Sequence, residues 1–205
     1  METMKAGGVE WGVAGSVLPG QSHSGDHHVV CSFPDGVLLA VLDGLGHGDE
    51  AAAAATKAAC VLEHDAKLPV TRLVQRCHEE LKASRGVVMS VASFTVSHGL
   101  LEWMGVGNVQ GILRRSDTQC LKSPEMLLLR SGVVGIHLPS LAAGVLPVFP
   151  GDTLIFATDG VREDFVDGPF SGNLQEAAKD IVARFWKGND DALVLIARFL
   201  MGNGT

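Results

Sequence analysis

The chain contains the stretch Val37-Leu38-Leu39-Ala40-Val41-Leu42-Asp43-Gly44-Leu45-Gly46-His47-Gly48, in which an apolar run leads into an aspartate and a glycine-rich turn. An apolar run of this length is typical of a buried strand, and glycines allow backbone carbonyls to approach a bound ion closely. The end of the strand therefore carries the Asp43 carboxylate into a turn that suits a hard metal ion.

A second apolar run lies just upstream, from His28 to Phe33, and the turn sequence Pro34-Asp35-Gly36 separates it from the first. Proline presets φ at its turn position, and glycine accepts a positive φ. The two runs therefore predict an antiparallel hairpin that ends at Asp43.

Two further acidic positions adjoin apolar strands downstream. Thr153 to Thr158 leads into Asp159-Gly160, and Asp190-Asp191 stands directly before the apolar run Ala192 to Ile196. In an antiparallel sheet the end of one strand lies beside the start of its neighbour, so we expect Asp43, Asp159 and Asp190 to meet at one edge of one sheet. The alternative is that each Asp-Gly pair is an ordinary turn without chemistry.

Hydrophobic spacing predicts the remaining elements. Apolar residues at helical spacing, or a run of alanines, favour three helices, and short apolar runs bounded by glycine or proline favour further strands. We expect helices over Asp49 to Lys67, Val70 to Leu81 and Leu174 to Phe185, and further strands over Val9 to Val17, Val87 to Val96, Leu100 to Met104, Val109 to Leu113, Met126 to Leu129 and Val145 to Phe149. This order predicts an α+β fold in which two antiparallel sheets form a sandwich flanked by helices, as a single domain over residues 1–205.

Composition excludes some classes of protein. The net charge is -7, and lysines and arginines are scattered, so nothing indicates a nucleic-acid or anionic-membrane surface. The four cysteines, Cys31, Cys60, Cys77 and Cys120, are far apart and form no disulfide or zinc pattern, which favours free thiols in a reducing compartment. No apolar run approaches the ~20 residues of a membrane span, so we expect a soluble cytoplasmic protein.

Three carboxylates held together repel one another unless cations neutralise them. All-oxygen ligands suit Mg²⁺ or Mn²⁺ better than zinc, which prefers Cys and His. Two such ions bridged by an aspartate and a water would lower the pKa of that water and hold the attacking and leaving oxygens. The reaction that this arrangement favours is in-line hydrolysis of a phosphate ester.

Taken together, several segments resemble the PPM family of metal-dependent protein serine/threonine phosphatases, also called PP2C-like, in the bacterial SpoIIE/RsbU branch. The resemblance rests on Gly25-Asp26, Asp43 to Gly48, Gly86 to Ala92, Gly105 to Asn108, Pro150 to Gly160 and Asn189 to Asp191. The short chain is most similar to the stand-alone type that resets stressosome scaffold proteins. The family therefore implies an αββα sandwich and hydrolysis of phosphoserine or phosphothreonine by a metal-bridging water.

The resemblance also implies a ligand set for two Mn²⁺ or Mg²⁺ ions. Asp43 would bridge both ions, the Gly44 carbonyl would bind the second, and Asp159 and Asp190 would hold the first. Asp26 takes the place of the acidic residue that reaches the second ion. The neighbouring Asp191 is the alternative to Asp190.

Other positions depart from the family pattern or have two interpretations. Asn108 and Leu193 stand where many members carry an aspartate and a hydroxyl residue, and no arginine near Trp11 matches the usual phosphate-binding one. His47 is a candidate general acid, and the alternative is a surface histidine at a helix start. Arg162 is either a phosphate contact or a solvated loop residue.

Three functions remain open from the sequence. The first is a phosphatase acting in negative feedback on stressosome proteins in general stress signalling, or on an anti-sigma-factor antagonist. The second is a catalytically inactive PPM-fold module that binds a partner. The third is a dimetal hydrolase of small phosphoesters.

Overall fold

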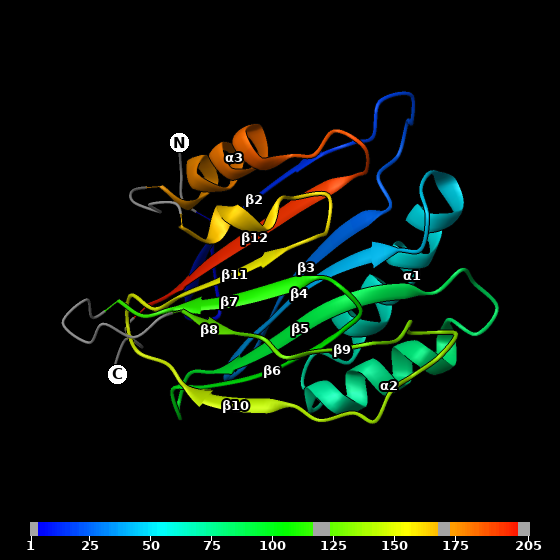
Figure 1. The fold of residues 1–205 in the computed structure, drawn as a ribbon. Helices are drawn as coiled ribbons and strands as arrows, with labels where there is room; N and C mark the ends of the chain where they lie inside the picture. Colours follow the sequence, from blue (N-terminus) through cyan, green and yellow to red (C-terminus); the bar gives the residue numbers. More distant parts are fainter. Residues whose placement is uncertain (1–3, 117–123, 168–172, 201–205) are drawn as a thin grey trace.

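The computed structural model describes residues 4–116, 124–167 and 173–200. Within these residues, two β-sheets lie face to face, and helices cover the outer surface of each (Figure 1). We call them the first and the second sheet. The predicted sandwich of two sheets flanked by helices is confirmed.

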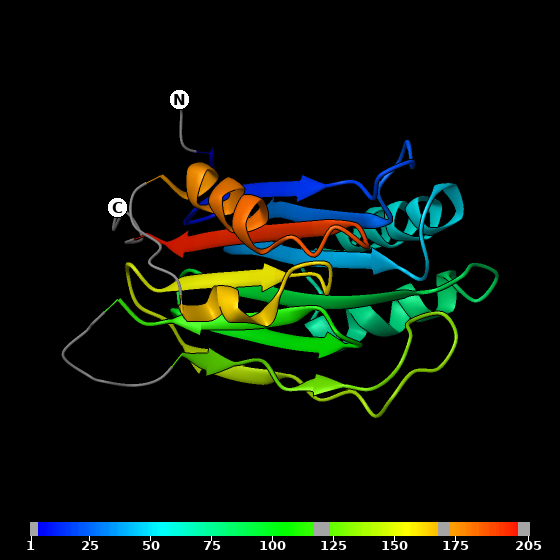
Figure 2. The same ribbon diagram turned by 45° about the horizontal axis from the view of Figure 1, so that its top comes forward.

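The first sheet is antiparallel throughout. Its strand order is β1 (Met4–Ala6), β2 (Val9–Ser16), β12 (Ala192–Phe199), β11 (Thr153–Ala157), β7 (Gln110–Arg114) and β8 (Glu125–Met126). A short 3₁₀ helix, η1 (Glu163–Asp167), and α3 (Leu174–Phe185) lie on the outer side of this sheet (Figure 2).

Two sets of hydrogen bonds fix α3 on the first sheet. The Asn173 side chain accepts hydrogen bonds from the backbone N–H groups of Gln175 and Glu176, which caps the helix. The Gln175 side chain then exchanges two hydrogen bonds with the backbone of Val13 in β2. Helix and strand approach so closely that a Cβ on Gly12 would lie 2.4 Å from the Gln175 nitrogen, so this position requires glycine.

The second sheet has the order β10 (Gly144–Pro147), β6 (Leu100–Val106), β5 (Val87–Thr95), β4 (Gly36–Gly44) and β3 (Asp26–Phe33). A further short strand, β9 (Leu129–Arg130), pairs with β6 in parallel. The outer face is covered by α1 (Asp49–His64) and α2 (Val70–Glu80). The small alanines on the inner face of α1 are buried, which lets this helix lie close to the sheet; they are Ala51, Ala54, Ala55, Ala58 and Ala59.

Strand β4 is buried on both faces, as its continuous apolar run predicts. Val37, Leu39 and Val41 point between the two sheets, and Leu38, Ala40 and Leu42 point toward the helices. Side chains alternate along a strand, so Asp43 follows the first set and points between the sheets. Burial of each leucine contributes about 1.5–3 kcal/mol to stability, which anchors the strand that carries Asp43.

Two predictions about strand placement are wrong. The run Met126 to Leu129 is not one strand but two, β8 in the first sheet and β9 in the second, because the chain crosses from one sheet to the other. Asp43 also does not share a sheet with Asp159 and Asp190. It belongs to β4 of the second sheet, whereas the others adjoin β11 and β12 of the first. The hydrophobic runs identify strands but do not say which sheet each one joins.

Among the described residues, no helix is both long and apolar enough to span a membrane. Cys31, Cys60 and Cys77 are free thiols. The prediction for Cys120 concerns a position outside the described residues.

Candidate metal centre

Asp26 and Asp43 face each other across the β3–β4 hairpin. They are directly paired in the antiparallel register, so their side chains lie on the same face of the second sheet. Since Asp43 points between the sheets, both carboxylates are directed toward the first sheet. Asp26 is only 9% exposed, and Asp43 is half-buried.

The first sheet contributes Thr158 and Asp159, which follow β11. The Thr158 hydroxyl donates a 2.8 Å hydrogen bond to Oδ2 of Asp26 and accepts one of 2.9 Å from the Leu193 backbone N–H. Thr158 is 1% exposed, so both bonds are shielded from water. Thr158 was not among the predicted site residues, although a hydroxyl at the end of a buried strand needs polar partners.

The two adjacent aspartates before β12 have different surroundings. Asp191 is 3% exposed, and its two carboxylate oxygens accept backbone hydrogen bonds of 2.7 Å from Leu18 and 2.6 Å from Gly25. These bonds hold the loop between β2 and β3. Asp190 accepts one bond, of 2.9 Å from the Asp191 backbone N–H, through Oδ1. Its Oδ2 has no hydrogen-bond partner among the residues that the structure describes, which favours Asp190 over Asp191 as a ligand.

Asp159 is held by neighbours from other elements. Its Oδ2 accepts a 2.7 Å hydrogen bond from the Asn108 side chain, and its backbone carbonyl accepts one of 2.6 Å from Lys187 Nζ. Asn108 is thus a donor to a carboxylate rather than a further negative charge.

The electrostatics of the cluster oppose ionisation. Burial first, and then the charges of the neighbouring carboxylates, Asp43 above all, raise the pKa of Asp26 to about 8, although the Thr158 hydrogen bond acts in the opposite direction. Burial and then the Asp159 charge raise the pKa of Asp43 to about 7. The pKa of Asp159 is also raised, first by burial and then by Asp190. A cation among these groups would remove the mutual repulsion.

The donor chemistry fits Mg²⁺ or Mn²⁺, because every converging side chain offers carboxylate oxygen. As they stand, no three of the described His, Cys, Asp and Glu side chains are arranged to hold a metal ion by themselves. The fit therefore rests on the kind of donor and on the repulsion between buried carboxylates, and the ligand set stays a prediction.

Gly44 ends β4 next to Asp43. Its backbone N–H donates a 3.0 Å hydrogen bond to the Gly25 carbonyl, and a Cβ at this position would lie 2.1 Å from the Ala51 carbonyl oxygen. Only glycine therefore lets the first turn of α1 approach the end of β4. The predicted role of its own carbonyl as a ligand stays a prediction.

Within the described part of the chain, no hydrogen bond or ion pair joins His47 or Arg162 to the carboxylate cluster. His47 is exposed on the loop before α1. Arg162 lies over the Phe185 ring at 5.2 Å and pairs with Asp164. Arg85, a cation that was not among the predicted site residues, lies over the same loop as His47. It pairs with Glu50, and a Cβ on Gly46 would lie 3.0 Å from its Nη1.

The chain is similar to several known proteins. The family model for stage II sporulation protein E (SpoIIE) matches residues 34–200. The phosphoserine phosphatase RsbX of Bacillus subtilis (strain 168) is 29% identical over 94 residues, 46% of this chain. That match spans about half of the relative, 47% of its length.

Two solved structures have a similar fold over nearly the whole chain. One comes from work on the bacterial stressosome as a modular system adapted to control secondary messenger signaling. It has a TM-score of 0.85 and 27% identity, and the match covers 93% of this chain and 99% of that one. The other is RsbX in complex with magnesium, with a TM-score of 0.84, 20% identity and coverage of 97% and 98%.

Proposed function

Because the chain belongs to the SpoIIE family of PP2C-type phosphatase domains, we propose that it hydrolyses phosphoserine or phosphothreonine monoesters in a partner protein. The observation that carries this proposal is the pairing of Asp26 and Asp43 on the face of the second sheet that meets Thr158 and Asp159 of the first. Buried and half-buried carboxylates from both sheets thereby share one end of the sandwich.

The residues that would hold two Mn²⁺ or Mg²⁺ ions are Asp26, Asp43, the Gly44 carbonyl, Asp159 and Asp190. Asp43, which interacts electrostatically with both Asp159 and Asp190, is the proposed bridging ligand. When bound, the two ions would supply a water activated for attack and neutralise charge on the phosphate.

The chain's own residues hold these ligands in place. Thr158 orients one oxygen of Asp26, and Asn108 orients one oxygen of Asp159. Asp191 fixes the loop that leads into Asp26, through its bond from the Gly25 N–H. Fixing the carboxylates before the substrate arrives reduces the reorganisation needed in the transition state.

Two cations adjoin the candidate centre. Lys187 donates to the carbonyl of Asp159, and Arg85 lies beside Gly46 in the loop that follows Asp43. A phosphomonoester is a dianion, so such cations attract it toward the carboxylate cluster once bound ions have neutralised that cluster. They are the proposed counterparts of the arginine that is absent near Trp11.

The proposed substrate class is a phosphorylated stressosome protein. The support for this narrower proposal is the 27% identity over nearly the whole length of a chain from the stressosome work, together with the partial match to RsbX. Feedback resetting of general stress signalling in the cytoplasm is the role that this substrate class suggests.

The test is Mn²⁺-dependent dephosphorylation of phosphorylated stressosome scaffold homologues from the same genome, read by mass spectrometry. We expect loss of phosphate from serine or threonine with the wild-type chain, and no loss with EDTA or with Asp43→Asn. The exposed Asp180 of α3 supplies a matched control, Asp180→Asn, which should act as the wild type does. Undiminished turnover by Asp43→Asn would contradict the proposed site. A folded chain that binds the partners without removing phosphate would indicate a binding module instead.

A further inference from the structure

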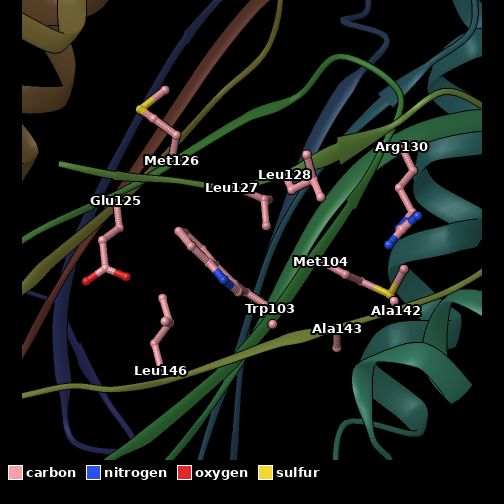
Figure 3. Close-up of a pocket in the computed structure, with 11 residues that line it drawn as sticks. Trp103, Met104, Glu125, Met126, Leu127, Leu128, Arg130, Ala142, Ala143 and Leu146 are labelled. Carbon is pink, nitrogen blue, oxygen red and sulfur yellow. The ribbon is translucent and has the colours of Figure 1, made fainter. Parts of the chain in front are cut away.

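The outer edge of β6 is shared by two strands. β10 pairs with Leu100 to Trp103, whereas β9 pairs with Gly105 and Val106, so Met104 falls between the two pairings. A groove of about 300 Å³ opens there, with residues 125–130 along one wall and residues 142–146 along the other. Figure 3 shows the Trp103 and Met104 side chains between these two walls.

The groove is apolar, and part of it is open to water. Trp103 and Met104 form its base and are 5% and 2% exposed. On the wall formed by residues 125–130, Leu127 is 8% and Leu128 is 75% exposed. Large apolar side chains gathered at a groove in this way mark a surface that binds a partner.

Two polar groups in the groove lack partners among the described residues. The first is the indole N–H of Trp103, which donates to no described group. A Cβ on Gly144 would lie 2.9 Å from this nitrogen, so glycine leaves it uncovered. The second is the Arg130 guanidinium, which extends into one end of the groove and forms no ion pair with a described residue (Figure 3).

The groove therefore carries an unneutralised positive charge at one end and none at the other. Glu125 lies at the other end, where Arg115 already neutralises it. Among the described lining residues, Arg130 alone keeps an uncompensated charge, so the groove fits an apolar segment that carries an acidic side chain.

The Arg130 end of the groove lies next to the candidate metal centre. The Arg130 carbonyl accepts a 2.9 Å hydrogen bond from the Gly107 N–H, and the following residue, Asn108, donates to Asp159. A segment lying in the groove thus continues toward the carboxylate cluster. A segment of the phosphorylated protein itself meets this requirement.

We propose that this groove binds an extended apolar segment of the phosphoprotein substrate, with an acidic side chain of that segment paired to Arg130. Leucine-type side chains of the segment cover Leu127 and Leu128, and one of its backbone carbonyls accepts from Trp103. This inference rests on the proposed function, because it assigns the occupant to the substrate of the same site.

The test measures binding of two fluorescein-labelled, unphosphorylated peptides to the full chain in EDTA, by fluorescence anisotropy. One peptide carries two leucines and a glutamate, and the matched peptide carries serines and a lysine in their places. We expect the first to bind at least tenfold more tightly. Leu128→Asp and Arg130→Glu should each weaken its binding about tenfold. Phe149, which is 61% exposed and outside the groove, supplies the control Phe149→Asp, which should bind as the wild type does.

Hydrolysis of p-nitrophenyl phosphate with Mn²⁺ separates the groove from the site. This small substrate does not reach the groove, so all three variants should hydrolyse it at the wild-type rate, which also shows that they are folded. Equal binding of both peptides, or unchanged binding by both groove variants, would overturn the groove proposal while leaving the phosphatase intact. Self-association of the wild type that Leu128→Asp abolishes would assign the groove to a second copy. Absence of p-nitrophenyl phosphate hydrolysis in every variant and the wild type would instead overturn the proposed function.

Discussion

Thr158 Oγ1 donates a 2.8 Å hydrogen bond to Asp26 Oδ2, and this bond joins the two sheets at the candidate metal centre. The threonine follows β11 of the first sheet, whereas the aspartate begins β3 of the second. The Leu193 N–H in turn donates to the threonine oxygen, so one hydroxyl connects three strands. The Thr158 hydroxyl therefore links the two sheets and also orients the Asp26 carboxylate.

Thr158→Val should therefore lower stability and metal affinity together. Valine keeps the shape but leaves the buried Asp26 oxygen and the Leu193 N–H unpaired, which costs about 1–3 kcal/mol. Urea unfolding measures the first effect, and Mn²⁺ titration calorimetry measures the second. Thr158→Ser, which keeps the hydroxyl, should recover most of both. Unchanged metal affinity in Thr158→Val would show that the bond does not orient a ligand.

Stability of the metal-free chain should fall as the pH rises. The pKa values of Asp26 and Asp43 are raised from 3.8 to about 8 and about 7, so their protonated forms favour the folded state. This contribution is complete below pH ~4 and is lost as the pH rises through the folded-state pKa values. In EDTA the melting temperature should fall between pH ~5 and 8, and Mn²⁺ should reverse this slope. Asp26→Asn should flatten the profile in EDTA, and an equal slope in that variant would contradict this assignment.

Substitutions of Asp190 and Asp191, the two aspartates before β12, should have different effects on stability and on metal affinity. Asp191→Ala removes the acceptor for the Leu18 and Gly25 N–H groups, and we expect a loss of about 3 kcal/mol in the free energy of unfolding. Asp190→Ala should change stability far less but lower Mn²⁺ affinity at least tenfold. Calorimetry and urea unfolding on both variants measure the difference. Stronger loss of metal affinity in a folded Asp191→Ala would reverse the ligand assignment.

His47→Ala should keep phosphatase activity within about threefold of the wild type. His47 is exposed, and no hydrogen bond or ion pair to a described residue fixes its ring. A general acid in the reaction would contribute about 10²–10⁴-fold. Steady-state rates on a phosphopeptide across the pH range decide between these values, and a hundredfold loss with a flattened pH profile would establish His47 as the acid.

The sequence predicted the sandwich well because the strands are apolar runs bounded by clear turns, as in the hairpin that ends at Asp43. It also drew attention to the acidic positions beside buried strands, because a carboxylate there needs solvent or a cation, and their role as metal ligands stays a prediction. The partition of strands between sheets was not predictable, because hydrophobic alternation sets which side chains are buried and not which strands are neighbours. The same reason explains the division of Met126 to Leu129 between β8 and β9.

The role of Thr158 and the groove beside β6 could not be predicted from the sequence either. The role of Thr158 depends on Asp26, which lies 132 positions away in the chain and in the other sheet. The groove exists because β9 and β10 pair with different halves of β6. Both features follow from tertiary packing rather than from local pattern.

The most direct test of the central claim, that Asp43 joins two metal ions held between the sheets, is a Mn²⁺ titration by calorimetry. The wild type and the control Asp180→Asn should bind two ions, and Asp43→Asn should lose at least one of them along with phosphopeptide hydrolysis. Binding of two ions with unchanged affinity by a folded Asp43→Asn, or no Mn²⁺ binding by the wild type, would contradict the account.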